Sequence, residues 1–363
     1  MPYQLVGNKN GLCGASASLL NLISSFNMVP TGYNTQFAVR EYWGADVKRV
    51  LQLFVLATIL AVPFPALAGT LTRTFVSATG SDSNPCTTAA PCASFAVAYN
   101  AAAVDGIVAA LDPGKYGPLT ITHSITIEGN GWAAITAPVG SPLDTGGIVV
   151  NANSSDGIIL RGLTIDGAGA SGGGGNVTNG IFFQAGGSLT VDDCTIRNMS
   201  GVGLYFNSSG TTAQSLSVSN TTINQTAQQG LSIITGNTGT ITASIVHSVL
   251  INNVSAVQVN AEVSGAIVAA IKDSVISNNQ GAISSNAAAG TTANVTVTRT
   301  QIANNNVGVS NASATSTIWL AQSTVVDNGI PYDASQGPVK TYQDNYFAYN
   351  GASIGSLTNA AQQ

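Results

Sequence analysis

The chain has 363 residues, a formal net charge of −5 and only 7% charged residues. Globular chains usually carry about a quarter charged residues, so Ser, Thr, Asn and Ala must cover most of this surface. The acidic balance and the lack of any basic cluster exclude a nucleic-acid-binding surface, which needs grouped Lys and Arg. The 40 Gly residues and the many Asn and Thr are weak helix formers, so the composition favours β-structure with many turns.

Residues 47–69, VKRVLQLFVLATILAVPFPALAG, have the layout of a secretory signal peptide. Lys48 and Arg49 precede an apolar core that is too short for a transmembrane helix, and a small-x-small cleavage site ends at Ala68. We therefore predict a secreted, periplasmic or cell-surface protein with no membrane attachment after cleavage. Residues 1–46 show no periodicity, and either a misassigned start near Val47 or an uncleaved signal anchor would explain them.

Four cysteines are present, and two of them lie close together. Cys86 and Cys92 are six positions apart in NPCTTAAPC, and a disulfide between them is the natural expectation in an exported protein. Cys194 has no obvious partner and is expected to pack as a small apolar residue. The two His residues and the dispersed Asp show no ligand spacing, so no metal site is predicted.

A repeat of 26 or 27 residues runs through the second half of the chain. Five segments, from SLTVDDCTIRNMS to VTVTRTQIANNNV, align on one apolar anchor each. The anchors are Ile196, Ile223, Leu250, Ile276 and Ile302. Val325 extends the series, while Ile165 and Ile127 begin it with longer steps that Gly-rich inserts explain. Apolar residues alternate around each anchor, which predicts short strands with one inward face.

Amide or acid side chains recur two positions after the anchors. They are Asn198, Gln225, Asn252, Asn278, Asn304 and Asp327. Stacked amides can bond to the coils above and below and satisfy backbone groups at a sharp turn. The period and this column together predict a β-solenoid. Leucine-rich repeats would need a dense Leu skeleton, and WD40 blades would need a longer repeat.

Over roughly residues 74–351 the chain resembles the pectin-lyase-like, right-handed parallel β-helix superfamily. FVSATGSDSNPC (75–86) and residues 91–131 resemble its entry region, and TYQDNYFAYNG (341–351) resembles its closing segment. The resemblance implies an all-β, right-handed parallel β-helix of about eight to nine coils. It also implies a short N-terminal helix, capped by Ser94 and running to about Ala103, that plugs the open end.

The predicted organisation has five segments. Residues 1–46 are a doubtful leader, 47–68 the signal peptide, 69–104 an N-terminal cap with the Cys loop and helix, 105–330 the parallel β-helix, and 331–363 a C-terminal cap and tail. A solenoid with paired edges is expected to be a monomer.

Catalytic candidates are few. A polygalacturonase-like hydrolase needs carboxylates about 6.5–9.5 Å apart. Asp192-Asp193 is the best candidate, although adjacent Asp residues more often form turns. A lyase or epimerase needs a base and a group that neutralises the uronate carboxylate. The repeat register places His123, Arg161 and Asp192 in one column. In that hypothesis Asp192 or Asp193 is acid, base or cation ligand, Arg161 holds the carboxylate and His123 moves a proton.

A second column, one position later in the repeat, holds His247, Asp273 and Arg299. Coils stack about 4.8 Å apart, so either column could grip an acidic glycan or pair internally as exposed salt bridges. Exposed aromatic rings would add a platform for sugar, although Phe more commonly packs in the core. The aromatic candidates are Tyr205, Phe182, Phe183 and Trp319.

Three functions follow from these patterns. The superfamily includes pectate lyases, polygalacturonases, alginate epimerases, phage tailspikes and secreted proteins of no known activity, so the resemblance implies polysaccharide contact without fixing a reaction. The absence of catalytic motifs favours a non-catalytic, exported β-helix that binds polysaccharide or serves as an extracellular scaffold, with no cofactor. The alternatives are a divergent lyase, hydrolase or epimerase on acidic glycans, with Ca²⁺ in the lyase case, and an adhesin-like surface protein.

Overall fold

The computed structural model describes residues 71–138, 146–167, 178–208, 210–236 and 239–361. All of these belong to one compact unit, Ala66–Gln363. The leader predicted for residues 1–46 and the signal peptide predicted for residues 47–68 lie outside the described residues. Within the described part of the chain, no helix is long and apolar enough to cross a membrane.

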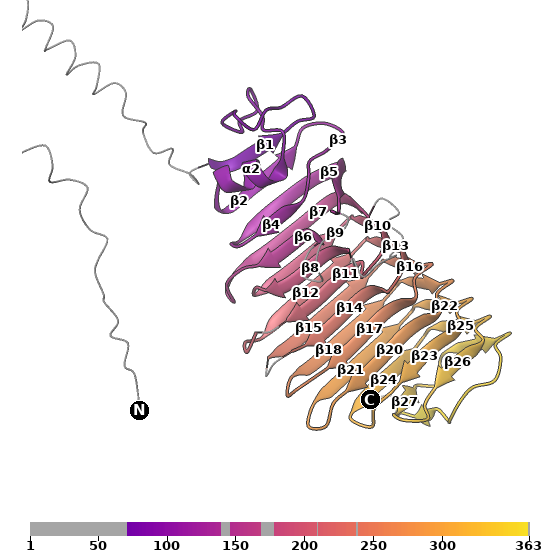
Figure 1. Cartoon of the computed structure of the whole chain (residues 1–363). Helices are drawn as coiled ribbons and strands as arrows, with labels where there is room; N and C mark the ends of the chain where they lie inside the picture. Colours follow the sequence, from indigo (N-terminus) through magenta and orange to yellow (C-terminus); the bar gives the residue numbers. More distant parts are fainter. Residues whose placement is uncertain (1–70, 139–145, 168–177, 209, 237–238, 362–363) are drawn as a thin grey trace, which may run out of the picture. The chain divides into compact units, whose positions relative to one another are not determined.

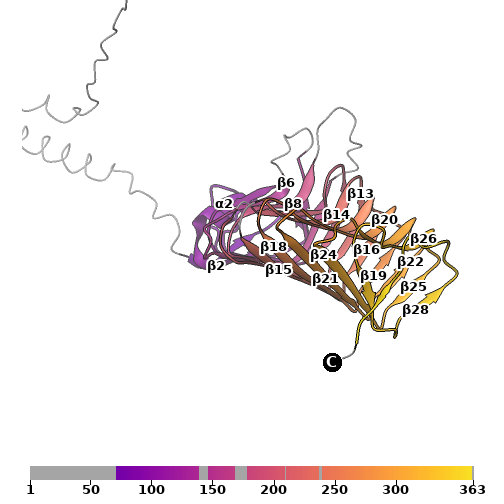
Figure 2. The same cartoon turned by 90° about the horizontal axis from the view of Figure 1, so that it is seen from below.

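Parallel strands stack along one axis and form three faces, as the views in Figures 1 and 2 show. The first face contains β1 (Leu71–Val76), β2 (Ala102–Ala110), the start of β5 (Ile125–Thr136), the start of β7 (Gly157–Asp166), β9 (Ser188–Asp192), β12 (Gln214–Ser219), β15 (Thr240–Val246), β18 (Ala266–Lys272), β21 (Thr292–Thr298), β24 (Ser316–Ala321), β27 (Val339–Thr341) and β29 (Thr358–Asn359). The second face contains β3 (Gly114–Lys115), the ends of β5 and β7, β10 (Thr195–Met199), β13 (Thr222–Thr226), β16 (Val249–Ile251), β19 (Val275–Ser277), β22 (Gln301–Ala303), β25 (Thr324–Val326) and β28 (Tyr346–Ala348).

The third face is a nine-stranded sheet of its own. It contains β4 (Leu119–Ile121), β6 (Gly146–Asn151), β8 (Asn179–Ala185), β11 (Leu204–Ser208), β14 (Gln229–Thr235), β17 (Ser255–Ala261), β20 (Gly281–Ala287), β23 (Val307–Asn311) and β26 (Ile330–Asp333). Each of these strands belongs to a different coil. The described residues thus form an all-β parallel solenoid, as the sequence predicts, with a coil number that agrees with the expected eight to nine.

Alternating side chains build the core of the solenoid. In β18, for example, Ile267, Ala269 and Ile271 are buried while Val268, Ala270 and Lys272 are exposed. Because successive side chains of a strand point to opposite faces, each strand contributes one apolar row to the interior. The rows of all three faces join into one buried apolar cluster that extends from Val76 to Val339.

The predicted repeat register is confirmed for seven of the eight anchors. Ile196 pairs with both Ile165 and Ile223, and the series continues through Leu250, Ile276, Ile302 and Val325. The prediction for Ile127 is wrong, because this residue pairs with Leu160 on the first face. The residue paired with Ile165 is Ile135. The register shifts between Glu128 and Ala133, where extra residues stand between the first and second faces.

The first corner, between the first and second faces, is a turn with the same two-residue pattern in successive coils. The outward residue has a positive φ of 47–52° in six coils: Asp193, Asn220, His247, Asp273, Arg299 and Gln322. The next residue points inward and is buried: Cys194, Thr221, Ser248, Ser274, Thr300 and Ser323. From Thr221 onward each of these inward hydroxyls donates to the carbonyl two residues earlier.

The second corner, between the second and third faces, follows the same rule with amides. The residues predicted to form the amide ladder have a positive φ of 54–58° and point outward. The ladder itself lies one position later. Buried Asn253, Asn279, Asn305 and Asn328 each donate from Nδ2 to Oδ1 of the next member, over 2.9–3.1 Å, and the series ends at Asn350. The predicted ladder exists, but its position was wrong by one residue because the left-handed residue turns its side chain out.

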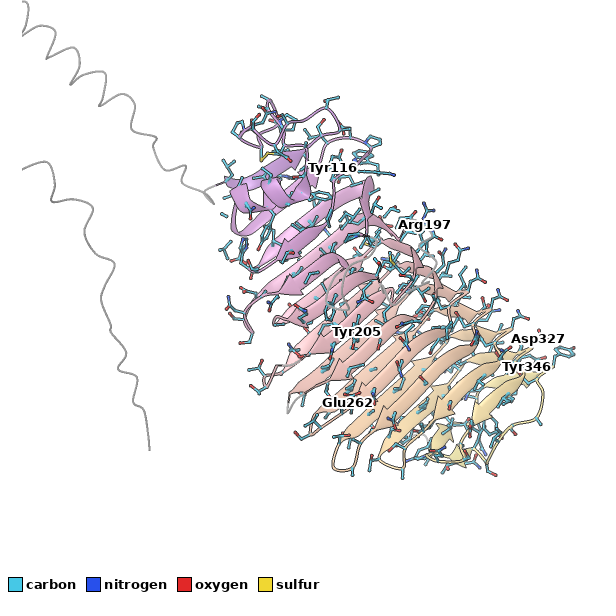
Figure 3. The ribbon with its side chains drawn as sticks, viewed as in Figure 1. Tyr116, Arg197, Tyr205, Glu262, Asp327 and Tyr346 are labelled. Carbon is cyan, nitrogen blue, oxygen red and sulfur yellow. A yellow bond between two sulfur atoms is a disulfide. The ribbon has the colours of Figure 1, made fainter. Side chains whose placement is uncertain are left out.

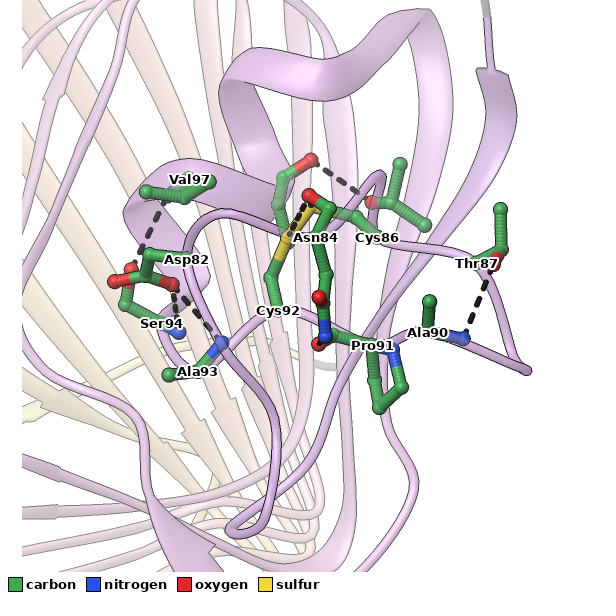
Figure 4. Close-up of a disulfide and its surroundings, with 12 residues drawn as sticks. Asp82, Asn84, Cys86, Thr87, Ala90, Pro91, Cys92, Ala93, Ser94 and Val97 are labelled. Atoms are coloured by element: carbon green, nitrogen blue, oxygen red, sulfur yellow. Dashed lines mark hydrogen bonds between the residues drawn. A yellow bond between two sulfur atoms is a disulfide. The ribbon is translucent and has the colours of Figure 1, made fainter.

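The N-terminal end carries the helix and the disulfide. Helix α2 (Phe95–Ala101) is shorter than predicted, because Ala102 already enters β2; Ser94 Oγ accepts a hydrogen bond from the Val97 N–H, as expected for an N-cap. The predicted bond between Cys86 and Cys92 is present (Figure 4). Asp82 fastens this loop to the helix start, since its Oδ1 accepts the N–H groups of Ala93 and Ser94 at 2.9 Å. The capping role of α2 stays a prediction.

Candidate functional site

Four charged side chains of alternating sign lie along the first face. Glu128 contacts Arg73 at 3.1 Å and Arg161 at 3.6 Å, and Arg161 Nε lies 3.3 Å from Asp192. Strand pairing explains the geometry, because Glu128, Arg161 and Asp192 occupy the same register position in β5, β7 and β9. We call Arg73, Glu128, Arg161 and Asp192 the charged column. Its two predicted members, Arg161 and Asp192, are brought together as expected.

Asp192 is held as a carboxylate by its neighbours. Ser219 Oγ donates to it at 2.7 Å and Asn220 Nδ2 at 3.0 Å, both from the following coil. These two hydrogen bonds, with that of Arg161, lower the pKa of Asp192 below its ordinary value despite its partial burial. Hydrogen bonds to a carboxylate favour the charged form. Asp192 is therefore ionised at neutral pH and is poorly suited to donate a proton.

The structure separates the other two catalytic candidates from this column. Asp193 is the outward, left-handed residue of the first corner, with φ 52°, which is the turn-forming role that its sequence suggested. His123 was expected to stack on Arg161, but that register was wrong because it relied on Ile127 as an anchor. The His123 ring instead stacks on Tyr99 at 4.4 Å, and the backbone N–H of His123 donates to the Tyr99 hydroxyl. The residue that stacks on Arg161 is Glu128.

The second predicted column exists as a triad of neighbouring side chains, His247, Asp273 and Arg299, at the first corner. Asp273 Oδ1 and Oδ2 accept hydrogen bonds from Arg299 Nε and Nη2 at 2.7 and 2.8 Å, and His247 Nε2 lies 3.9 Å away. The hydrogen bond from Arg299 lowers the pKa of Asp273, and the same contact raises that of Arg299. All three are outward residues of the corner with positive φ. They therefore lie in a row along the solenoid axis.

Tyr205 and Phe182 stack on neighbouring strands of the third face. Their ring centroids are 5.1 Å apart and their planes differ by 10°. Tyr205 is half-buried and is labelled in Figure 3, while Phe182 is buried. Phe183, the next residue, points inward and stacks on Phe206 at 4.1 Å. Phe182 and Phe183 are neighbours in β8, so their side chains point to opposite faces of the strand, and both are buried.

No group of three or more His, Cys, Asp or Glu residues in the described ranges is arranged to hold a metal ion. The charged column and the triad each alternate acid and base, so neither presents several carboxylates to one point. A calcium site of the lyase type would need such a group of oxygen ligands.

A groove of about 850 Å³ lies at the C-terminal end of the first face. Its walls come from β24, β27, β29 and the residues that follow β27 and β29. The lining residues are Trp319, Ala321, Gln322, Lys340, Tyr342, Asp344, Thr358, Asn359, Ala360 and Ala361. We call this the terminal groove. Its volume falls within the range of small-ligand clefts, about 300–1,000 Å³.

Two aromatic rings and one cation form the centre of the terminal groove. The rings of Trp319 and Tyr342 lie 5.9 Å apart with planes 24° from parallel. Lys340 Nζ lies 4.3 Å from the centre of the Trp319 ring, in cation–π contact. Lys340 directly opposes Trp319 in the pairing of β24 with β27, so the arrangement follows from register alone.

Sequence reasoning named Trp319 but missed Lys340 and Tyr342. The last coil is shorter than the others, since Asn350 follows Asn328 by 22 residues in the amide ladder. An alignment on the 26-residue period therefore does not identify this coil. The sequence nevertheless contains a pattern that would have identified the last coil. The segments VVDNG and FAYNG share the spacing of an apolar residue, a turn residue and Asn-Gly, and aligning them places Phe347 on Val325, as the structure does.

Comparisons with known proteins agree with this fold. A family model described as a domain of unknown function (DUF4957) matches residues 110–253. The pectate lyase Pel9A is 16% identical, with 81% of this chain and 80% of that chain covered and a TM-score of 0.54. The A-module of the Azotobacter vinelandii mannuronan C-5 epimerase AlgE4 is 13% identical, covering 71% and 89%, with a TM-score of 0.44.

A third solved structure is the pectin methylesterase PemA from Erwinia chrysanthemi, 13% identical over 79% of this chain and 92% of that chain, with a TM-score of 0.42. No curated protein matches the chain. Pel9A and this chain share a fold, but at 16% sequence identity the function of one protein cannot be assigned to the other. The chain therefore shares the parallel β-helix fold of Pel9A.

Proposed function

We propose that the chain is an exported β-helix protein that binds polysaccharide without cleaving it. The observation that carries the proposal is the state of Asp192, the best-placed catalytic candidate. A glycosidase needs one carboxyl group that is protonated before the reaction, with a raised pKa. Asp192 has the opposite character, because three neighbours donate hydrogen bonds to it and lower its pKa.

The charged column is also poorly suited to lyase or epimerase chemistry. Such a reaction needs a cation that is free to neutralise the substrate carboxylate and a base beside it. Arg161 contacts both Glu128 and Asp192, so a substrate would have to displace two carboxylates to reach it. His123, the expected proton carrier, stacks on Tyr99 instead of standing beside Arg161.

Export and glycan contact have separate support. The Cys86–Cys92 disulfide fits an oxidising compartment outside the cytosol, as does the signal peptide predicted for residues 47–68. The solved structures similar in fold include a pectate lyase. The first face also presents rows of Ser and Thr in β12, β15 and β21, and such hydroxyls pair readily with sugar hydroxyls.

The test is a binding and depolymerisation screen of the purified protein. Pectate, alginate and neutral polysaccharides are offered with and without calcium, and ultraviolet absorbance and reducing-end assays follow any cleavage. The expected result is binding of at least one glycan with neither unsaturated nor reducing ends formed. Cleavage that disappears in Asp192→Asn but persists in the exposed neighbour Asp193→Asn would overturn the proposal and make the protein an enzyme.

A further inference from the structure

The terminal groove combines two stacked aromatic rings, a pair of opposite charges and a set of polar side chains. Its two rings come from adjacent coils and are stacked, with centroids 5.9 Å apart. In the next coil, the chain after β29 contributes the small side chains of Ala360 and Ala361 to the lining. The Ala360 N–H is bonded to the Thr341 carbonyl at 2.9 Å, which holds this part of the lining at a fixed distance from the rings.

The charges of the groove cancel. Lys340 and Asp344 are the charged residues among those that line it. The Lys340 ammonium is engaged with the Trp319 ring, and Asp344 Oδ1 accepts the Gln322 N–H at 3.1 Å. The groove holds one cation and one anion, and each already contacts another group of the protein. It therefore has little electrostatic preference for an anionic ligand.

Polar groups that suit neutral hydroxyl ligands surround the rings. Gln322, Thr358 and Asn359 contribute side chains that donate and accept hydrogen bonds. Aromatic rings provide apolar area at low cost in side-chain entropy, and hydrogen-bonding groups at their edge fix the orientation of a ligand. A pyranose ring has the matching surface, with an apolar face of C–H groups and a rim of hydroxyls.

We propose that the terminal groove is a binding site for a neutral glycan, which stacks on Trp319 and Tyr342 and hydrogen-bonds to the polar rim. This site rests on the proposed function, because it assigns the binding of polysaccharide to one place. It also narrows the ligand to uncharged sugars. By contrast, the charged column and the triad at the first corner satisfy their own charges and take no part in it.

The experiment titrates the full-length protein with hexasaccharides of defined charge. Cello-, xylo- and mannohexaose are the neutral probes, and hexagalacturonate and hexamannuronate are the acidic probes. Isothermal titration calorimetry at 50 and 500 mM NaCl measures the Kd. We expect a neutral hexasaccharide to bind with a Kd that changes less than twofold with salt, and Trp319→Ala and Tyr342→Ala each to weaken it at least tenfold.

Two further variants test the place of binding and the role of charge. Trp132→Ala removes an exposed aromatic side chain of β5, 46% exposed, and is expected to leave the Kd unchanged. Lys340→Gln removes the cation that contacts the Trp319 ring and is expected to keep the preference for neutral over acidic hexasaccharides. Thermal unfolding of each variant shows whether it is folded, and Trp319→Phe supplies a milder change if Trp319→Ala is not.

The possible outcomes distinguish failure of the proposed site from failure of the proposed function. Binding of neutral glycans that is unaffected by both Trp319→Ala and Tyr342→Ala would overturn the site and leave the proposed function intact. Salt-sensitive binding of a uronate hexamer that is lost in Lys340→Gln would overturn the neutral ligand class. Failure of every hexasaccharide and every polysaccharide in the screen to bind would overturn both proposals together.

Discussion

The two corners of the solenoid solve the same problem with different side chains. Each places a left-handed residue outward and then a polar residue inward. At the first corner the inward residue is Ser or Thr from Thr221 onward, and at the second it is Asn from Asn253 onward. An amide has two donor hydrogens and an acceptor, whereas a hydroxyl has one donor hydrogen, so the two ladders are connected differently.

The amide ladder is continuous along the axis and the hydroxyl ladder is not. Asn279 Nδ2 donates to Asn305 Oδ1 and to the carbonyls of Leu250 and Ser277, while its own Oδ1 accepts from Asn253. Ser274 Oγ donates to the carbonyl of Lys272 in its own coil and accepts only the backbone N–H of Ser248 from the preceding coil. The second corner therefore links successive side chains directly, and the first corner links side chain to backbone.

The largest expected effect is that of removing one amide from the middle of the ladder. Asn279→Ala removes the acceptor of the Asn253 backbone N–H and one acceptor of its side-chain amide, and removes a donor from the carbonyls of Leu250 and Ser277. Each buried group left unsatisfied costs about 1–3 kcal/mol. We expect the free energy of unfolding to fall by about 3 kcal/mol or more. Chemical denaturation followed by circular dichroism measures it.

A matched control uses the exposed amide of the same corner. Asn306→Ala removes a side chain that lies on the surface, and its effect is expected to stay within about 0.5 kcal/mol. Equal losses in Asn279→Ala and Asn306→Ala would contradict a continuous ladder as the source of the stability.

A smaller effect is expected at the first corner. Ser274→Ala removes the acceptor of the Ser248 N–H and one of two donors to the Lys272 carbonyl, and we expect a loss of about 1–2 kcal/mol in the same denaturation experiment. Thr221 and Thr300 occupy the equivalent position in other coils, so Ser274→Thr should retain the wild-type value. If Ser274→Ala lowered the free energy of unfolding as much as Asn279→Ala, the hydrogen bonds between coils would contribute equally at the two corners, contrary to our expectation.

The smallest effect concerns the outward residues, where the corners differ in charge. Asp273 at the first corner is ion-paired with Arg299, whereas Asn278 at the second corner of the same coil is uncharged. Because Arg299 lowers the pKa of Asp273, the pair stabilises the fold above the ordinary carboxyl pKa, near 3.9. That contribution is lost as the pH falls through the lowered pKa of the folded state.

We therefore expect Asp273→Asn to lower Tm at pH 7 by about 1 °C or less, because the pair is exposed. The difference from the wild type should shrink in 0.5 M NaCl and vanish at acid pH once Asp273 is protonated. Differential scanning calorimetry between pH 7 and pH 2.5 measures it. A difference that persists unchanged across this range would mean that the contact acts through packing and not through charge.

Much of the fold was predictable because one side-chain pattern repeats. The anchors from Ile165 to Val325 were aligned correctly, since each is an inward apolar residue beside a turn of fixed length. Ile127 was misaligned because LTITHSITIEG resembles the later coils in its alternation, yet extra residues around Asn130 separate the faces there. Alternation alone does not report which face a strand belongs to.

The amide ladder shows a second limit of pattern reading. In Asn252-Asn253 and Asn278-Asn279 either member could point inward, and backbone φ decides between them. Asp327-Asn328 held the answer, because a charged residue is rarely buried without a partner, which leaves Asn328 as the inward member.

The candidate site was less predictable, because it depends on contacts between coils of unequal length. Arg161 and Asp192 were paired correctly through the regular register. Glu128 was missed with the misaligned first coil, and Lys340 and Tyr342 with the shortened last one. Irregular coils are thus both the hardest to align and the places where the solenoid acquires distinctive surfaces.

The inward position of the first corner also governs how the cysteines behave once the chain has folded. Cys194 occupies the place that Thr221 and Ser248 hold in later coils, and its Sγ lies 3.2 Å from the Asp192 carbonyl. Burial raises the pKa of this thiol to about 12. Thiolates, and not thiols, attack disulfides. Closing this one coil therefore withdraws Cys194 from thiol exchange, so in the mature fold it does not rearrange the bond between Cys86 and Cys92.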